Sequence, residues 1–303
     1  MNLILGVTAS GKGAVAFELA KRIGGEIISI DSMKVYRRMD IGTAKPSVER
    51  RGAIRHHIID VIEPSDSFSV DQFLKHTDGA MRQIVETGKE AVAVGGTALY
   101  IKALLYGIFD GPPADFGIRK RLKTESTEAL HRRLGEVDPG ASSRIHPNDL
   151  RRIIRALEVY ELTGKPISSF QTQFGSEPMR RDWRLIGLRR SKQSENGRIN
   201  RRAKRMIEEG LVEEVKALLA EERPLSKQAA CAIGYAEIIQ YLNGRGTLEE
   251  AVERIKVNSR RLAKAQRTWF KTFHEVNWLD VEEDEEAGSV VDRIMAMGEA
   301  GSS

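Results

Sequence analysis

The chain has 303 residues, of which 41% are hydrophobic and 30% are charged. This composition is typical of a globular protein and excludes a disordered or fibrous one. The length suits one large α/β domain, or such a domain with a smaller one inserted into it. No apolar run approaches the ~20 residues that cross a bilayer, and the single cysteine, Cys231, excludes an internal disulfide framework. We therefore expect a cytoplasmic protein with no membrane partner and no signal peptide.

The charged residues are unevenly distributed along the chain. The net charge of +5 is too small to indicate a nucleic-acid partner by itself. However, basic residues outnumber acidic ones between residues 119 and 155, and residues 254–271 contain basic residues and no acid. Acidic residues collect at 280–286. This segregation would steer a polyanion toward a basic surface, although solvated helix faces explain either basic stretch equally well.

The first third of the chain alternates between strand and helix patterns. Apolar, β-branched runs predict strands at residues 3–5, 26–30, 57–62 and 91–94. Helical periodicity predicts helices at 14–22, after the first strand, and at 70–87, before the fourth. Strands that alternate with helices favour βαβ crossovers, and therefore a parallel sheet in an α/β fold.

The pattern changes near Gly111, where strand-like runs stop and basic helical patterns continue to about Phe174. We interpret this stretch as a helical domain inserted into the α/β domain. The predicted core domain comprises residues 1–111 and 182–303, and the predicted insertion comprises residues 112–181. The remaining predicted elements of the core are strands at 183–188 and 276–281 and helices at 197–222, 232–242 and 248–273.

A glycine-rich loop follows the first predicted strand and matches the P-loop pattern G-x-x-x-x-G-K. Glycines let successive backbone N–H groups turn inward, the following helix N-terminus adds positive potential, and Lys12 supplies a point charge. The pattern therefore predicts a phosphate-binding site. Its residues are Gly6, Val7, Thr8, Ala9, Ser10, Gly11, Lys12 and Gly13.

Gly13 stands where a P-loop usually has Ser or Thr, whose hydroxyl helps to hold magnesium. A metal contact would have to be rebuilt here or bridged by water. Thr8 and Ser10 keep two hydroxyls within the loop, so phosphate binding is predicted more firmly than the metal ligands, which stay unknown.

Two polar residues follow predicted strands at the edge where open α/β sheets bind ligands. Asp31 follows the second strand, where a carboxylate could ligate magnesium, take a proton from an acceptor substrate or cap the next helix. Thr97 follows the fourth strand and either lines the same crevice or caps a helix. An ordinary NTPase needs a strand that ends in an acid, for which Asp60 is a weak candidate. His56 and His57 have no evident third metal ligand, and we expect them to be structural.

Seven ordered blocks of the sequence resemble the bacterial tRNA dimethylallyltransferase family, which prenylates an adenosine beside the anticodon. The resemblance covers nearly the whole chain. DSxxxY at 31–36, followed by DIGTAKP at 40–46 and VGGTxLY at 94–100, is far more specific than the P-loop. The blocks are GVTASGK at 6–12, ISIDSMKVYRRMDIGTAKP at 28–46, HHIIDVIEP at 56–64, VGGTALYIKALLYG at 94–107, VDPGASSRIHPNDLRRIIRALEVY at 137–160, GLVEEVKAL at 210–218 and AIGYAEII at 232–239.

The resemblance implies a P-loop kinase-like parallel sheet with a helical insertion that grips the tRNA anticodon stem-loop. It implies dimethylallyl diphosphate as the donor, used with Mg²⁺, and a pyrophosphate held by loop 6–13 and Arg198. Asp31 matches the general base. The implied tRNA-binding residues are Asp31, Ser32, Met33, Lys34, Thr97, Arg119, Arg151, Arg152, Ile153, Ile154 and Arg155. Glu195 and Asn196 depart from a common Leu-Tyr pair, which could alter packing beside the pyrophosphate.

The mechanism that these residues imply is a single transfer. The adenine leaves its stack, its N6 amine attacks the allylic carbon, and Asp31 takes the amine proton. Lys12 and the loop N–H groups meet the charge of the leaving pyrophosphate. Two rival functions use the same residues: a small-molecule kinase with ATP on the loop, and a non-catalytic RNA-binding or NTP-switch protein. We expect a monomer.

Overall fold

The computed structural model describes residues 1–108, 111–170 and 179–299. Its contacts divide the chain into two compact units. The core unit comprises Met1–Leu105 and Arg181–Ser303, and the insertion unit comprises Tyr106–Arg180. The sequence placed these boundaries at 111–112 and 181–182. Residue 174, where the sequence pattern of the insertion ends, lies outside the described residues.

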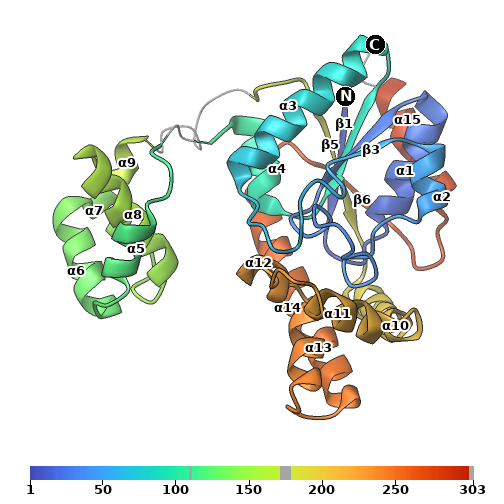
Figure 1. The fold of residues 1–303 in the computed structure, drawn as a ribbon. Helices are drawn as coiled ribbons and strands as arrows, with labels where there is room; N and C mark the ends of the chain where they lie inside the picture. Colours follow the sequence, from blue (N-terminus) through green and yellow to red (C-terminus); the bar gives the residue numbers. More distant parts are fainter. Residues whose placement is uncertain (109–110, 171–178, 300–303) are drawn as a thin grey trace. The chain divides into compact units, whose positions relative to one another are not determined.

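The core unit is built on a six-stranded parallel sheet, which confirms the predicted α/β class (Figure 1). The strand order is β3-β2-β4-β1-β5-β6. The strands are β1 (Asn2–Gly6), β2 (Glu26–Ile30), β3 (His56–His57), β4 (Ala91–Gly95), β5 (Arg184–Arg189) and β6 (Asn277–Asp280). Leu5 and Ile30 both pair with Gly95, so the carboxyl ends of β1, β2 and β4 lie together at one edge of the sheet.

Two helices pack side by side on one face of this sheet, α1 (Lys12–Ile23) and α15 (Ala287–Glu299) (Figure 1). Their apolar faces form one cluster with the central strands. Fully or nearly fully buried members of the cluster include Ile4, Val15, Leu19, Val92, Ile186, Val290 and Ile294. This core fixes α1 against β1, and therefore fixes the loop that connects them.

The other helices of the core unit include those predicted at 70–87, 232–242 and 248–273, whose bounds agree with the prediction to within three residues. They are α2 (Val48–Ala53), α3 (Val70–Glu86), α4 (Ala98–Tyr106), α10 (Lys192–Glu208), α11 (Leu211–Leu219), α12 (Lys227–Ala230), α13 (Tyr235–Leu242) and α14 (Leu248–Phe270). The single helix predicted at 197–222 is wrong. Gly210 adopts φ 96° between α10 and α11, a left-handed conformation that ends one helix before the next begins.

The third predicted strand is also shorter than expected. Residues 57–62 were predicted as a strand, but β3 ends at His57. Ile58 (φ 62°) and Asp60 (φ 55°) are left-handed, so the chain turns away from the sheet directly after the strand. No helix among the described residues combines the length and the apolar character of a membrane span.

The described residues of the insertion unit form helices joined by turns, with no strand among them (Figure 1). Its helices are α5 (Phe116–Leu122), α6 (Thr127–Val137), α7 (Pro139–Ser142), α8 (Leu150–Thr163) and α9 (Ile167–Phe170). Asp115, Ser126, Asp138 and Asp149 cap the first four by accepting a backbone N–H of the first turn. Leucine and isoleucine side chains from α5, α6 and α8 form a separate core, which includes Leu122, Leu130, Leu134, Ile153 and Leu157.

Candidate active site

The loop between β1 and α1 has a compact backbone turn. Ala9 (φ 64°) and Gly11 (φ 93°) are left-handed, and the Ser10 N–H donates to the Val7 carbonyl over 3.2 Å. A side chain at Gly6 would place its Cβ 2.7 Å from Ser10 Oγ, so the turn requires glycine there. Lys12 Nζ folds back and donates to the Val7 carbonyl over 3.0 Å. The lysine ammonium group is therefore held against the loop backbone.

Three arginines from the β5 to α10 region donate to the loop. Arg190 Nε donates to the Ser10 carbonyl (2.9 Å), Arg198 Nε to the Ala9 carbonyl (2.8 Å), and Arg202 Nη1 to Thr8 Oγ1 (3.0 Å). Of these three, Arg198 was predicted from the sequence, and Arg190 and Arg202 were not. Arg202 lies one helical turn after Arg198, so helical spacing is the signal that could have found it.

Burial and mutual repulsion disfavour the charged forms of the lysines and arginines at the loop. Burial, together with the charges of Lys34 and Arg202, lowers the pKa of Lys12 to about 7, although Asp31 opposes the shift. Burial also lowers the pKa of Lys34. It lowers the pKa of each arginine around the loop, which are Arg190, Arg198 and Arg202. A multivalent anion would relieve both the repulsion and the lost hydration, so this cation cluster fits a diphosphate.

Asp31 and Thr97 lie together just beyond the strands that precede them. Asp31 Oδ1 accepts the N–H groups of Met33 (2.9 Å) and Lys34 (3.3 Å). Thr97 Oγ1 accepts the N–H of Ser32 over 3.2 Å. Residues 32–36 form a turn and not a helix, so the helix cap that the sequence allowed for Asp31 is not formed, and its contacts to this turn use one carboxylate oxygen. Within the described residues Oδ2 accepts no hydrogen bond, which leaves it able to take a proton or to ligate a cation.

Gln266 on α14, which was not predicted from the sequence, connects the loop to the end of β4. Its Oε1 accepts the Thr8 N–H over 2.7 Å, and its Nε2 donates to the Gly96 carbonyl over 2.9 Å. A Cβ at Gly96 would lie 2.5 Å from Gln266 Nε2, so glycine is required for this contact. Since Thr97 follows Gly96, one buried amide sets the spacing between the loop and the residues around Asp31.

The residues considered for metal or NTPase roles have structural partners. His57 Nε2 lies 2.7 Å from Glu26 Oε2, and His56 Nδ1 lies 2.7 Å from the Ile54 carbonyl. Asp60 accepts Lys45 Nζ and Arg51 Nη1, each at 2.5 Å. The described part of the chain holds no cluster of three or more His, Cys, Asp or Glu side chains suited to a metal.

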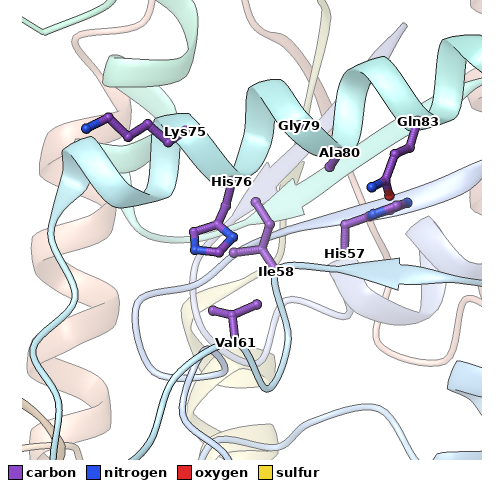
Figure 2. Close-up of a pocket in the computed structure, with 8 residues that line it drawn as sticks. All are labelled: His57, Ile58, Val61, Lys75, His76, Gly79, Ala80 and Gln83. Atoms are coloured by element: carbon purple, nitrogen blue, oxygen red, sulfur yellow. The ribbon is translucent and has the colours of Figure 1, made fainter.

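A surface hollow of about 370 Å³ lies between α3 and the segment that follows β3 (Figure 2). Figure 2 shows the hollow with its lining residues, which are His57, Ile58, Val61, Lys75, His76, Gly79, Ala80 and Gln83. None of them belongs to the loop or to the cation cluster. The hollow therefore adds nothing to the site at β1, β2 and β4.

The insertion unit presents some of its predicted tRNA-binding residues and buries others. Arg151 and Arg152 are exposed, whereas Ile153 and Ile154 are packed in the core of the unit. Side chains that are buried in this way cannot reach RNA, so any contact from this helical turn falls to its arginines. Arg119 and Arg155 are partly exposed, and both bind the buried carboxylate of Glu158.

Comparison with known proteins places the chain in a family. The model of the IPP transferase family matches residues 34–273. The chain belongs to the IPP transferase family. A tRNA dimethylallyltransferase of Geobacter metallireducens is 46% identical, over 92% of this chain and 91% of that protein. A tRNA dimethylallyltransferase of Shouchella clausii is 45% identical, over 97% of this chain and 95% of that protein. The resemblance noted from the sequence is thus confirmed.

Solved structures of this family share the fold. The tRNA isopentenylpyrophosphate transferase of Bacillus halodurans is 40% identical with a TM-score of 0.71, over 99% of this chain and 97% of that chain. A eukaryotic dimethylallyltransferase, described as acting on tRNA, is 26% identical with a TM-score of 0.85, over 99% of this chain and 79% of that chain. The P-loop kinase-like sheet expected from the resemblance is therefore confirmed.

One departure from the expected IPP transferase sequence has a partner in the structure. Glu195 on α10, where a Leu was expected, is 3% exposed and forms an ion pair with Arg267 on α14. Burial raises the pKa of Glu195 even though Arg267 opposes the shift. Arg267 and Arg260 belong to the basic stretch at 254–271, but both have partners on α10: Arg267 pairs with Glu195, and Arg260 donates to Asn200 Oδ1 over 3.0 Å.

Proposed function

We propose that this chain transfers the dimethylallyl group of dimethylallyl diphosphate to the N6 amine of an adenosine next to the anticodon of tRNA, with release of diphosphate. The observation that carries the proposal is the desolvated cation cluster around loop 6–13, with Asp31 acting electrostatically on Lys12, Lys34 and Arg202. The names of the family's curated members support the donor and the acceptor.

The loop and the arginines bind the donor and stabilise its leaving group. Negative charge builds up on the diphosphate as the allylic C–O bond breaks. Lys12 and Arg198 are already held beside the loop by their hydrogen bonds to the loop carbonyls. Such pre-oriented donors stabilise the transition state without the reorganisation that water requires.

Asp31 and Thr97 serve the acceptor. The adenine must leave its stack in the anticodon loop to bring N6 to the donor. As the new C–N bond forms, the amine loses a proton, and Asp31 Oδ2 accepts it. Thr97 Oγ1 accepts a hydrogen bond from Ser32 and still carries its own O–H, which can donate to the target nucleotide.

We also propose that Mg²⁺ accompanies the donor. Mg²⁺ binds mainly through phosphate oxygens and water, so it needs few protein ligands. Ser10 Oγ is buried and has no hydrogen-bond partner among the described residues, and Thr8 supplies a second hydroxyl in the loop. These hydroxyls would hold the ion, because Gly13 lacks the hydroxyl that a P-loop usually has at its position. The bound cation would supply additional positive charge to the diphosphate. The monomeric state and the cytoplasmic location stay predictions from the sequence.

The decisive experiment compares donors and tests Asp31. Labelled dimethylallyl diphosphate and γ-labelled ATP are each incubated with the protein and an anticodon stem-loop RNA. We expect label in RNA from the first donor alone, whereas phosphorylation by ATP would support a kinase instead. Asp31→Asn keeps an oxygen for the N–H groups of Met33 and Lys34 but loses the base. We expect turnover to fall ~10²–10⁴-fold with RNA affinity and melting temperature unchanged. Wild-type turnover in this variant would remove Asp31 from catalysis.

A further inference from the structure

A fully buried carboxylate lies between two arginines in the insertion unit. Glu158 on α8 is 0% exposed. Its Oε1 accepts Arg119 Nε (2.8 Å) and the Asp115 N–H (2.7 Å), and its Oε2 accepts Arg119 Nη2 (2.8 Å) and Arg155 Nη1 (2.7 Å). Both carboxylate oxygens are therefore fully used.

This arrangement keeps the carboxylate charged in an apolar core. Burial opposes ionisation, but the hydrogen bonds of Arg119 and Arg155 outweigh it and keep the pKa of Glu158 below its usual value. A buried charge is tolerated when it is paired and hydrogen-bonded in this way. Its removal would take away the one ion-pair partner that Arg119 and Arg155 share.

The same geometry leaves positive charge at the surface. The Arg119 side chain is 34% exposed and the Arg155 side chain 28% exposed, although the carboxylate beneath them is buried. Arg119 binds side-on through Nε and Nη2, so its Nη1 group makes no hydrogen bond within the described residues. Arg155 Nη2 donates to the Pro112 carbonyl over 2.9 Å, which fixes the second guanidinium to the chain that leads into α5.

We propose that Glu158 is a positioning residue for RNA binding: it holds Arg119 and Arg155 as a rigid pair that binds a backbone phosphate of the tRNA. This inference rests on the proposed function, because that function assigns RNA contacts to the two arginines. A planar guanidinium binds phosphate through two parallel N–H groups, so its orientation matters as much as its charge.

Glu161, one helical turn after Glu158, offers a matched control. It forms ion pairs with Arg121 and Arg133, so it too is shared by two arginines of this unit. Its side chain is 15% exposed, and the Arg121 side chain is 62% exposed. Neither of its arginines was assigned an RNA contact. Glu161→Gln therefore changes the charge of the unit as Glu158→Gln does, without loosening Arg119 and Arg155.

The test measures the affinity of the full-length protein for an anticodon stem-loop RNA over a range of salt concentrations. Glu158→Gln adds one positive charge, so a purely electrostatic role predicts equal or tighter binding. We expect instead roughly tenfold weaker binding, with a higher KM for RNA but unchanged kcat and unchanged KM for dimethylallyl diphosphate. Glu161→Gln should bind as tightly as wild type or more tightly. Equal or tighter binding by Glu158→Gln across the salt range would overturn the proposal.

A second variant keeps the proposal testable if Glu158→Gln does not fold. Arg119→Lys retains the charge and an ion pair with Glu158 but lacks the planar guanidinium, which can hold the carboxylate by one edge and present further N–H groups to a phosphate. We expect a similar loss of RNA affinity, whereas wild-type affinity would overturn the idea of an oriented pair. The binding measurements need no turnover. If wild-type protein transfers no dimethylallyl group while Glu158→Gln still weakens RNA binding, the proposed reaction fails and the positioning role stands.

Discussion

Gly13 is the residue at which this chain departs from the usual phosphate loop, and the structure has room for the missing group. It occupies the second position of α1, and a Cβ there would meet no atom within 4 Å. We predict that Gly13→Thr lowers the Mg²⁺ concentration needed for half-maximal turnover several-fold, because the added hydroxyl contacts the ion. The measurement is turnover during a Mg²⁺ titration. Gly13→Ala is the control, since it removes the helix cost of glycine, about 0.5–1 kcal/mol, without adding an oxygen. An equal shift in both variants would contradict the prediction.

Lys12 carries a stability cost that its function explains. Burial lowers the pKa of Lys12 in the folded protein from the ordinary lysine value of 10.5 to about 7. Between these values the unfolded chain binds more protons than the folded one, so stability rises with pH, and the cost is largest below pH 7. We predict that Lys12→Met raises the melting temperature at pH 6, and that this gain shrinks as pH approaches 10. Lys21→Met, on the exposed side of α1, is the control and should show neither effect.

Melting curves with added inorganic diphosphate complete this test. Diphosphate should stabilise the wild-type protein by mass action and should stabilise Lys12→Met much less. A lower melting temperature for Lys12→Met than for Lys21→Met at pH 6 would show that the lysine is not held at a cost.

At the level of elements, α14 sets the distance between the donor and acceptor sides of the site. Gln266→Leu would leave the Thr8 N–H and the Gly96 carbonyl without their partner, at a cost of about 1–3 kcal/mol. We predict that kcat falls roughly 10²-fold because the loop shifts relative to Asp31. RNA affinity should not change. Thr268→Val, on an exposed position of the same helix, serves as the control in steady-state kinetics. Wild-type kcat in Gln266→Leu would mean that the loop keeps its position without this bridge.

The sequence predicted the elements whose signals are local. The strands β1, β2 and β4 are short β-branched or apolar runs that end at glycine or at Asp31, and their boundaries agree with the structure to within one residue. Residues 58–62 are equally apolar, but left-handed conformations at Ile58 and Asp60 depend on tertiary contacts that no local pattern encodes. Gly210 was visible in the sequence, yet a glycine within a helical pattern does not by itself predict a break.

The same distinction between local patterns and tertiary contacts explains which residues of the site were predicted. The loop was predicted because its motif is contiguous in sequence. Arg190, Arg202 and Gln266 contact the loop from 180, 194 and 258 residues away, and only the folded sheet brings them there. Glu158 was also missed, because a carboxylate within a basic helix looks like a surface ion pair until its burial is known.

For the molecule as a whole, the two units have separate hydrophobic clusters. The core unit contains the predicted diphosphate site, and the insertion unit contains the arginines assigned to RNA. Leu19 is 1% exposed in the first cluster, and Leu134 is 0% exposed in the second. Substitution of either leucine by alanine is expected to cost 2–5 kcal/mol, a range typical of buried leucines. The two variants should differ in which ligand they lose.

We predict that Leu134→Ala weakens RNA binding but leaves the stabilisation by inorganic diphosphate unchanged, because the lost packing lies in the insertion unit. Leu19→Ala should do the reverse: it loosens α1 against the sheet, so diphosphate binding weakens while RNA affinity at low temperature is retained. Calorimetric scans with and without diphosphate, combined with RNA titrations, measure both effects. If Leu134→Ala reduces diphosphate binding as strongly as Leu19→Ala does, the two units depend on each other for stability, and RNA and donor binding cannot be separated by core substitutions.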